Sequence, residues 1–192
     1  MLKDLGPKPF LFPMPVLLLA TYDENKKVNV MNMAWGGIYG DEKVVLDLDP
    51  SHKSYRNIKL NKSFTLSVAD IPHLKEADYF GIVSGNKDAD KFERTGLRAA
   101  PSSFVDAPIL LDFPISLECS VLEIVEEKND VHIVGRILNT LADDRIFDET
   151  GKIDATKIQA FVYDTFQHNY YAIGEKVGKA FSDGRSLAEQ NK

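Results

Sequence analysis

The chain has 192 residues, 44% of them hydrophobic and 27% charged, as in an ordinary soluble globular protein with one sizeable core. Its net charge of −6 argues against nucleic acid as the main partner, because phosphate backbones are bound by basic faces. The single cysteine, Cys119, excludes a disulfide framework, a CxxC redox pair and a cysteine-rich metal site. The longest apolar run, residues 10–20, contains two prolines and is too short to span a bilayer, and no signal-peptide cleavage site follows it. We therefore expect a cytoplasmic protein that is not inserted in a membrane.

The first half of the sequence predicts strands separated by polar turns. Apolar and polar residues alternate in segments that end in turn residues, which is typical of half-buried strands. Gly36-Gly37 and residues 39–41 are expected to break the pattern, and Pro50 to end the strand before it because proline cannot donate to a sheet. The strands are expected at 16–22, 28–35, 43–48 and 64–69.

The second half predicts two short helices and then the clearest strands of the chain. A helical stretch at 70–83 is followed by a loop at 84–87 and a short helix at 89–95. Residues 97–114 are expected to be irregular, and 115–126 and 131–141 to form a hairpin. A charged excursion at 143–156, a mixed segment at 161–181 and a loosely ordered tail at 182–192 complete the chain. Without repeats or a linker, residues 1–192 are interpreted as one mainly β domain, a barrel or sandwich with few helices.

Residues 43–60 contain the first candidate site. A strand ends at Pro50, and Ser51, His52, Lys53 and Ser54 follow it, with Ser54 placed as the N-cap of a helix over 55–60. Two hydroxyls, an ammonium group and free helix N–H groups at one point predict an anion site. The alternative is an ordinary capped turn with a solvated lysine.

Side chains alone offer little catalytic chemistry. The four histidines form no metal-binding motif, and His132 lies in an alternating strand where a packed or solvent-facing role is expected. The sequence contains no serine-hydrolase elbow, no dinucleotide fingerprint and no P-loop. We therefore predict no catalytic side chain and no metal, and look for a bound cofactor.

Two further segments suit a flavin mononucleotide, which needs cations and N–H donors for its phosphate and apolar faces for its ring. One strand end offers an amide, an indole and backbone groups, which belong to Asn32, Met33, Ala34 and Trp35. Ser84-Gly85 followed by Lys91 provides a second small-residue turn with a cation. The alternatives are that Trp35 belongs to the core and that Lys91 is a charge on a helix surface.

In order and spacing, these pieces resemble the flavin reductase-like family, the FMN-binding split barrels that include flavoredoxin. Nearly the whole chain takes part, from about Gly6 to Gly184. The segments that carry the resemblance are Pro15-Val16, 28–35, 53–58, 64–68, 84–92, Pro108-Ile109, 117–119 and 171–181.

This resemblance implies a Greek-key split β-barrel that pairs as a homodimer and holds FMN non-covalently near the dimer interface. It implies that Asn32, Met33, Ala34 and Trp35 border the isoalloxazine. The phosphate would be held by Ser51, Lys53, Ser54, Ser84, Gly85 and Lys91.

The resulting hypothesis is an FMN-dependent oxidoreductase that passes hydride or electrons between NAD(P)H and the flavin or a downstream acceptor. One alternative is a flavoredoxin-type carrier that exchanges electrons with a protein partner and ignores NAD(P)H. Another is a β-barrel module that binds FMN or a different anionic ligand without turnover.

Overall fold

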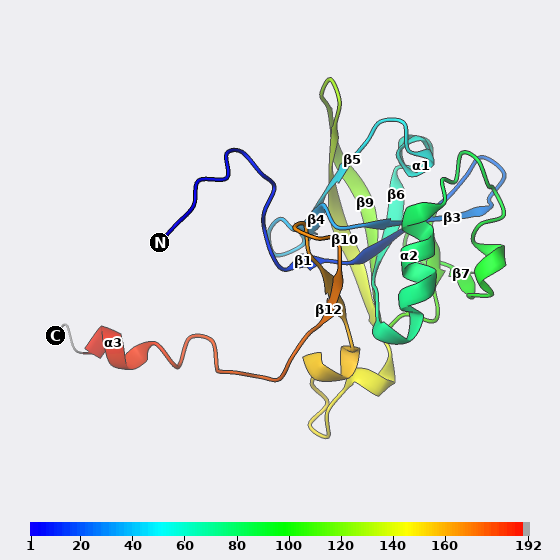
Figure 1. The fold of residues 1–192 in the computed structure, drawn as a ribbon. Helices are drawn as coiled ribbons and strands as arrows, with labels where there is room; N and C mark the ends of the chain where they lie inside the picture. Colours follow the sequence, from blue (N-terminus) through cyan, green and yellow to red (C-terminus); the bar gives the residue numbers. More distant parts are fainter. Residues whose placement is uncertain (190–192) are drawn as a thin grey trace.

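The computed structural model describes residues 1–189, and its centre is a curved antiparallel sheet of seven strands in the order β3-β2-β6-β9-β10-β5-β4 (Figure 1). A three-stranded sheet, β1-β11-β12, and a hairpin, β7-β8, accompany it. The strands are β1 (Met14–Pro15), β2 (Leu17–Tyr22), β3 (Val28–Met33), β4 (Gly36–Ile38), β5 (Lys43–Leu48), β6 (Ser63–Val68), β7 (Ala99–Pro101), β8 (Pro108–Leu110), β9 (Ile115–Glu126), β10 (Val131–Ala142), β11 (Phe161–Tyr163) and β12 (Tyr170–Ala172).

Helices are few and short, which together with the curved sheet confirms the mainly β prediction. The helices are α1 (Lys53–Asn61), α2 (Leu74–Ile82) and α3 (Arg185–Glu189), with 3-10 turns η1 (Ile71–His73), η2 (Glu93–Thr95), η3 (Asp144–Ile146) and η4 (Ala155–Ile158).

Strand β2 is buried on both of its faces. Leu17 and Leu19 belong to one apolar cluster, which also contains Ile58 of α1. Leu18 belongs to a second cluster, which also contains Phe80 of α2. Because side chains alternate along a strand, this arrangement places α1 against one face of the sheet and α2 against the other.

The interior of the curved sheet is closely packed around Phe64. A Cβ atom added to Gly135 would lie 2.6 Å from Cζ of Phe64, and the β9–β10 register shifts beside it. Gly135 therefore makes room for the ring where the sheet bends. Cys119, the cross-strand partner of Phe64, is fully buried in the same cluster, and burial raises the pKa of its thiol to about 12.

Several expected element boundaries are wrong for identifiable reasons. Gly36-Gly37 does not break the sheet, because β4 pairs with β5 through Gly36–Leu46. Residues 97–114 contain the β7–β8 hairpin. Of the helix expected at 89–95 only η2 forms, because the Asp88 carboxylate accepts the N–H of Asp90 in a tight turn. The expected loose tail contains α3, and residues 190–192 of it lie outside the described part.

The helix after β5 starts earlier than expected. It begins at Lys53, and His52 rather than Ser54 is its N-cap. Ser54 lies inside the first turn, 2% exposed, where its hydroxyl accepts a hydrogen bond of 2.9 Å from Nδ2 of Asn29. Because Asn29 on β3 supplies this partner, the hydroxyl serves tertiary packing and does not cap the helix.

Candidate functional site

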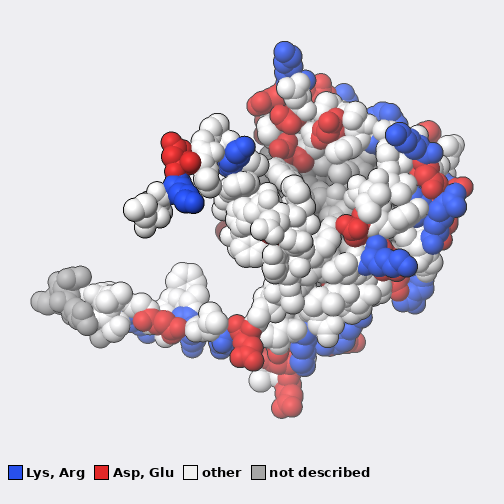
Figure 2. Space-filling view, in the orientation of Figure 1, with Lys and Arg blue, Asp and Glu red and all other residues white. Residues whose placement is uncertain are grey.

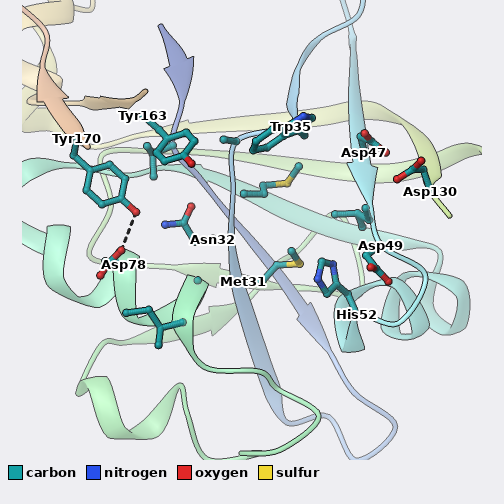
Figure 3. A pocket seen from close by; sticks show the side chains of 16 residues that line it. Met31, Asn32, Trp35, Asp47, Asp49, His52, Asp78, Asp130, Tyr163 and Tyr170 are labelled. Carbon is teal, nitrogen blue, oxygen red and sulfur yellow. Dashed lines mark hydrogen bonds between the residues drawn. The ribbon is translucent and has the colours of Figure 1, made fainter. Parts of the chain in front are cut away.

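A cavity of about 580 Å³ lies between the end of β3, helix α2 and strands β11 and β12 (Figure 3). This volume is within the range of about 300–1,000 Å³ that small-molecule sites occupy. The lining residues are Val16, Met31, Asn32, Met33, Ala34, Trp35, Asp47, Leu48, Asp49, His52, Asp78, Gly81, Ile82, Asp130, Tyr163 and Tyr170.

All four residues of the predicted ring-binding segment line this cavity. Strand β3 ends at Met33, so Ala34 and Trp35 lie where the chain crosses towards β4. Asn32 donates from Nδ2 to the carbonyl of Ala77 in α2, at 2.9 Å, which ties the strand end to the helix. Trp35 is 45% exposed and its ring centroid lies 6.4 Å from that of Tyr163, so the alternative that places Trp35 in the core is wrong.

The wall opposite the β5 end contains a polar pair that the sequence did not reveal. Tyr170 on β12 donates its hydroxyl to Oδ1 of Asp78 on α2, at 2.9 Å. Burial and this hydrogen bond raise the pKa of Tyr170 to about 12, so the phenol keeps its proton at neutral pH. The two residues are 92 positions apart, and neither of them was assigned to a site from the sequence.

The predicted anion site forms a corner beside the cavity, which we call the basic corner: Ser51, Lys53, Ser54, Ser84, Gly85 and Lys91. None of these residues lines the cavity itself, but His52, next to Ser51 and Lys53, and Ile82, two positions before Ser84, do. The loop after α2 meets the start of α1 here, because Nδ2 of Asn86 donates to the carbonyl of Ser51 at 2.8 Å.

Gly85 allows this close approach. A Cβ atom at this position would lie 2.2 Å from Oδ1 of Asn29 and 3.4 Å from Cδ of Lys53. A larger residue would therefore displace the loop from the helix start. Ser84 stands at the same loop and accepts the N–H of Asn86 at 3.3 Å.

Lys53 is only partly available to a ligand. Its ammonium lies 2.9 Å from Oδ2 of Asp23, and the two side chains are 13% and 6% exposed. The other oxygen of Asp23 accepts the N–H groups of Asn25 and Lys27, so the carboxylate also holds the β2–β3 turn. These hydrogen bonds and the Lys53 charge overcome the effect of burial and lower the pKa of Asp23. Lys53 is thus not the freely solvated lysine of the alternative interpretation.

Lys91 is buried, 3% exposed, so the alternative that places it on a helix surface is wrong. Its ammonium donates to the carbonyls of Val83 at 2.8 Å and Phe80 at 3.3 Å, which belong to the end of α2. These carbonyls lack a partner within the helix, so the lysine caps α2. Burial, and then the charge of Lys53, lower the pKa of Lys91 to about 8.

The basic corner has the chemistry that an anionic group requires. In the described part of the chain, no side chain caps the start of α1, so its first N–H groups remain available beside Lys53. Lys53 and Lys91 are close enough for the charge of one to lower the pKa of the other. A bound anion would relieve that repulsion.

Within residues 1–189, no group of three or more His, Cys, Asp or Glu side chains is arranged to hold a metal ion. Across the same residues, no helix has the length and apolar character needed to cross a bilayer.

Comparison with known proteins identifies the family. Residues 10–163 match the family model "Flavin reductase like domain". The chain belongs to the flavin reductase-like family, which confirms the resemblance seen in the sequence.

Solved structures agree in fold over nearly the whole chain. The flavoredoxin of Desulfovibrio vulgaris (Miyazaki F) is 32% identical and superposes with a TM-score of 0.90, over 96% of this chain and 100% of that one. A flavoredoxin from Methanosarcina acetivorans is 24% identical, with a TM-score of 0.87 over 97% and 100% of the two chains. An uncharacterized protein of Aquifex aeolicus is 23% identical over 152 residues, 76% of this chain and 77% of that protein. The split-barrel fold is thereby confirmed.

Proposed function

We propose that this protein binds FMN non-covalently, one molecule per chain, and passes hydride or electrons between a donor and an acceptor. The observation that carries this proposal is the position of a ring-sized cavity directly beside the basic corner. The 32% identity to a flavoredoxin over nearly the whole chain also supports it. When bound, the flavin would supply the redox chemistry, accepting and releasing electrons that side chains cannot carry.

In this proposal, the residues Asn32, Met33, Ala34 and Trp35 border the ring. The half-exposed indole of Trp35 offers an apolar face, and the Asn32 amide fixes the strand end against α2. Tyr170 and Asp78, joined by their own hydrogen bond, place a phenol oxygen and a carboxylate on the other wall. The chain's own contribution is to position the ring and limit water, which requires no acid–base residue.

The basic corner would hold the phosphate. Lys53 and the N–H groups at the start of α1 are the donors we assign to it, and the Ser51 hydroxyl would join them by turning away from the Asp49 carboxylate to which it now donates. Ser84 and Gly85 are small residues that would let the loop after α2 approach the phosphate closely. Lys91 would act mainly by its charge and by fixing the end of α2, because two carbonyls already occupy its ammonium.

Equilibrium dialysis tests the central claim. We expect purified protein to be yellow, or to become yellow with FMN, at one flavin per chain. FMN should bind far more tightly than riboflavin, because only FMN carries the phosphate. Absence of FMN binding at micromolar protein and ligand would contradict the proposal.

For the electron donor, we propose NAD(P)H, with a protein donor of the flavoredoxin type as the second candidate. The likeness to flavoredoxins supports the second candidate, and membership of the flavin reductase-like family supports the first. Anaerobic reduction of the flavin-loaded protein by NADH, NADPH and dithionite, followed spectrally, separates them. Reduction by dithionite alone would favour the protein donor.

We also propose that the protein is a cytoplasmic homodimer. Residues 1–13 and 173–189 form two arms that extend away from the sheets (Figure 1), and the base of the first arm contacts Phe166 and Tyr171 through Phe10 and Phe12. Both arms expose large apolar side chains, which a second copy would cover. These are Met1, Leu2, Leu5, Phe10, Leu11 and Phe12 on one arm and Ile173, Val177 and Phe181 on the other. Light scattering should give the dimer mass, and a monomer mass at saturating FMN would contradict this.

A further inference from the structure

The cavity is lined by carboxylates and by no matching cations. Asp47, Asp49, Asp78 and Asp130 all contribute to its wall (Figure 3). Within the described residues, no lysine or arginine lines it, and His52 is the one basic residue in the wall. This acidity contrasts with the basic corner beside it.

Three of these carboxylates gather at one end, which we call the acidic end: Asp47, Asp49 and Asp130. Asp47 is on β5, Asp49 follows that strand, and Asp130 is in the turn between β9 and β10. Figure 3 shows their side chains together on the side of the cavity opposite Tyr170. Acidic side chains also gather on the surface below the projecting β9–β10 hairpin (Figure 2).

The charge at the acidic end is poorly compensated. Oδ1 of Asp47 is buried and accepts no hydrogen bond from any described residue. The group facing it is His132, its cross-strand partner, whose Nδ1 lies 3.4 Å away. The Nε2 atom of the same ring lies 3.6 Å from Oε1 of Glu127, a further carboxylate. One imidazole, charged only when protonated, therefore stands between two acids.

Asp49 is held in its ionised form. Its Oδ1 accepts the backbone N–H of Ser51 at 2.7 Å. Hydrogen bonds from Ser51 lower the pKa of Asp49, so the carboxylate is charged at neutral pH. Among residues 1–189, these acids do not form a group arranged to hold a metal ion.

We propose that Asp47, Asp49 and Asp130 tune donor specificity by repelling anions, so that NAD(P)H, the donor proposed above, binds more weakly than an uncharged or cationic donor of the same chemistry. The proposal rests on the proposed function of the cavity. A nicotinamide dinucleotide carries a charged pyrophosphate and must approach the cavity with it. Repulsion by three carboxylates, screened over a Debye length of about 10 Å, should weaken such a dianion by roughly five- to tenfold.

A pair of hydride donors with the same reaction but different charge tests this inference. N-benzyldihydronicotinamide is uncharged, whereas NADH carries the pyrophosphate. With either donor, the dihydropyridine ring loses a hydride, which is two electrons and a proton, and becomes a pyridinium cation. The flavin receives that hydride, so the two reactions differ only in what surrounds the ring.

The experiment compares flavin-loaded parent protein with the triple variant Asp47→Asn, Asp49→Asn, Asp130→Asn under anaerobic stopped flow. The rate with NADH, divided by the rate with the benzyl donor, should rise roughly five- to tenfold in the variant. Calorimetry with tetrahydro-NADH, which cannot give up a hydride, should show the same gain in affinity. At about 1 M salt, where the Debye length is about 3 Å, the difference should nearly vanish.

A second triple variant controls for net charge: Glu24→Gln, Asp41→Asn, Glu149→Gln. These three residues are exposed and do not line the cavity. The rate ratio and the tetrahydro-NADH affinity should stay at parent values. Should the Asp47 change prevent folding, the exposed Asp49→Asn, Asp130→Asn pair should still give roughly a threefold gain.

An unchanged ratio and affinity in the acidic-end variant would overturn the inference, as would an equal gain in the control. Either result, obtained with protein that binds FMN and is reduced by dithionite, leaves the proposed function standing. Failure to bind FMN would instead remove the proposed function and this inference together.

Discussion

The basic corner and the acidic end of the cavity lie on either side of a single turn. Asp49 belongs to the acidic end, Lys53 to the basic corner, and Pro50 to His52 connect them. The turn supports both regions. Its Ser51 N–H donates to the Asp49 carboxylate, and its His52 is the N-cap of the helix that carries Lys53. We therefore expect the phosphate to bind on one side of this turn and anionic groups to be repelled on the other.

The two regions also differ in how their charges are paired. In the basic corner, Lys53 is paired with Asp23 and Lys91 with two carbonyls, so each cation has a structural partner. At the acidic end, Asp47 has a buried oxygen that accepts no hydrogen bond from the described residues. Changes in the corner should thus affect both stability and binding, whereas changes at the acidic end should affect mainly the choice of ligand.

Removal of the Lys53 charge should give the largest effect on binding. Because Lys53→Ala alone would leave Asp23 buried without its partner, the substitution is best made in an Asp23→Asn background. A hydrogen bond to a charged group contributes about 1.5–3 kcal/mol, so FMN should bind roughly ten- to a hundredfold more weakly than to Asp23→Asn alone. Riboflavin affinity, measured by the same dialysis, should barely change.

Lys75→Ala, an exposed lysine on α2, is the matched control and should leave both flavins unaffected. Added salt should weaken FMN more when Lys53 is present, since screening acts on that charge. Equal weakening of FMN and riboflavin would mean that Lys53 shapes the fold and that the phosphate binds elsewhere.

The lowered pKa of Lys91, in the basic corner, makes the free energy of unfolding depend on pH. Its pKa is about 8 in the folded protein and 10.5 as the ordinary value, so between these values the unfolded chain binds more protons. The free energy of unfolding of the parent should therefore rise, relative to Lys91→Met, as pH increases from about 8 to about 10. At roughly 1.4 kcal/mol per pH unit, the gain is about 2 kcal/mol.

Urea denaturation of flavin-free protein at several pH values measures this difference. Because the same Tyr170 and Cys119 groups titrate in parent and variant, their contributions cancel in the comparison. Lys75→Met serves as the control and should run parallel to the parent. If the free energy of unfolding of Lys91→Met followed the same pH dependence as the parent, the inward, desolvated position of this lysine would be contradicted.

The smallest expected effect comes from Trp35, in the proposed ring-binding wall of the cavity. Since the indole is 45% exposed, Trp35→Ala should lower the free energy of unfolding by about 1 kcal/mol, whereas a core tryptophan would cost about 3–5 kcal/mol. FMN and riboflavin should both weaken about fivefold, because an aromatic contact contributes about 1 kcal/mol to either flavin. A loss confined to FMN would contradict this assignment, and Trp35→Phe should retain most of the affinity.

The sequence predicted those parts of the candidate site whose residues are consecutive in the chain. Asn32 to Trp35 are consecutive, so a strand end predicted from alternation carries all four residues of the proposed ring-binding wall. Ser51 and Lys53 likewise follow the strand that ends at Pro50. Local pattern therefore predicted these pieces, even though the helix start was misplaced by the assumption that Ser54 caps it.

The remaining features depend on tertiary contacts that no local pattern encodes. Tyr170 meets Asp78 across 92 positions, and no spacing rule joins them. Lys91 turns inward because the carbonyls at the end of α2 need a donor, whereas composition alone places a lysine at the surface. The short β7–β8 hairpin was missed because its prolines suggested irregular chain.

The buried Cys119 has a practical consequence for studying this protein. Flavins that react with oxygen generate peroxide, which oxidises exposed thiolates first. A thiol with a pKa of about 12, enclosed beside Phe64, should be inert to peroxide and to maleimide reagents alike. A cysteine introduced at exposed Ile82 would thus be the single reactive thiol in the chain, and a fluorophore there would report on events at the cavity mouth in an otherwise unaltered background.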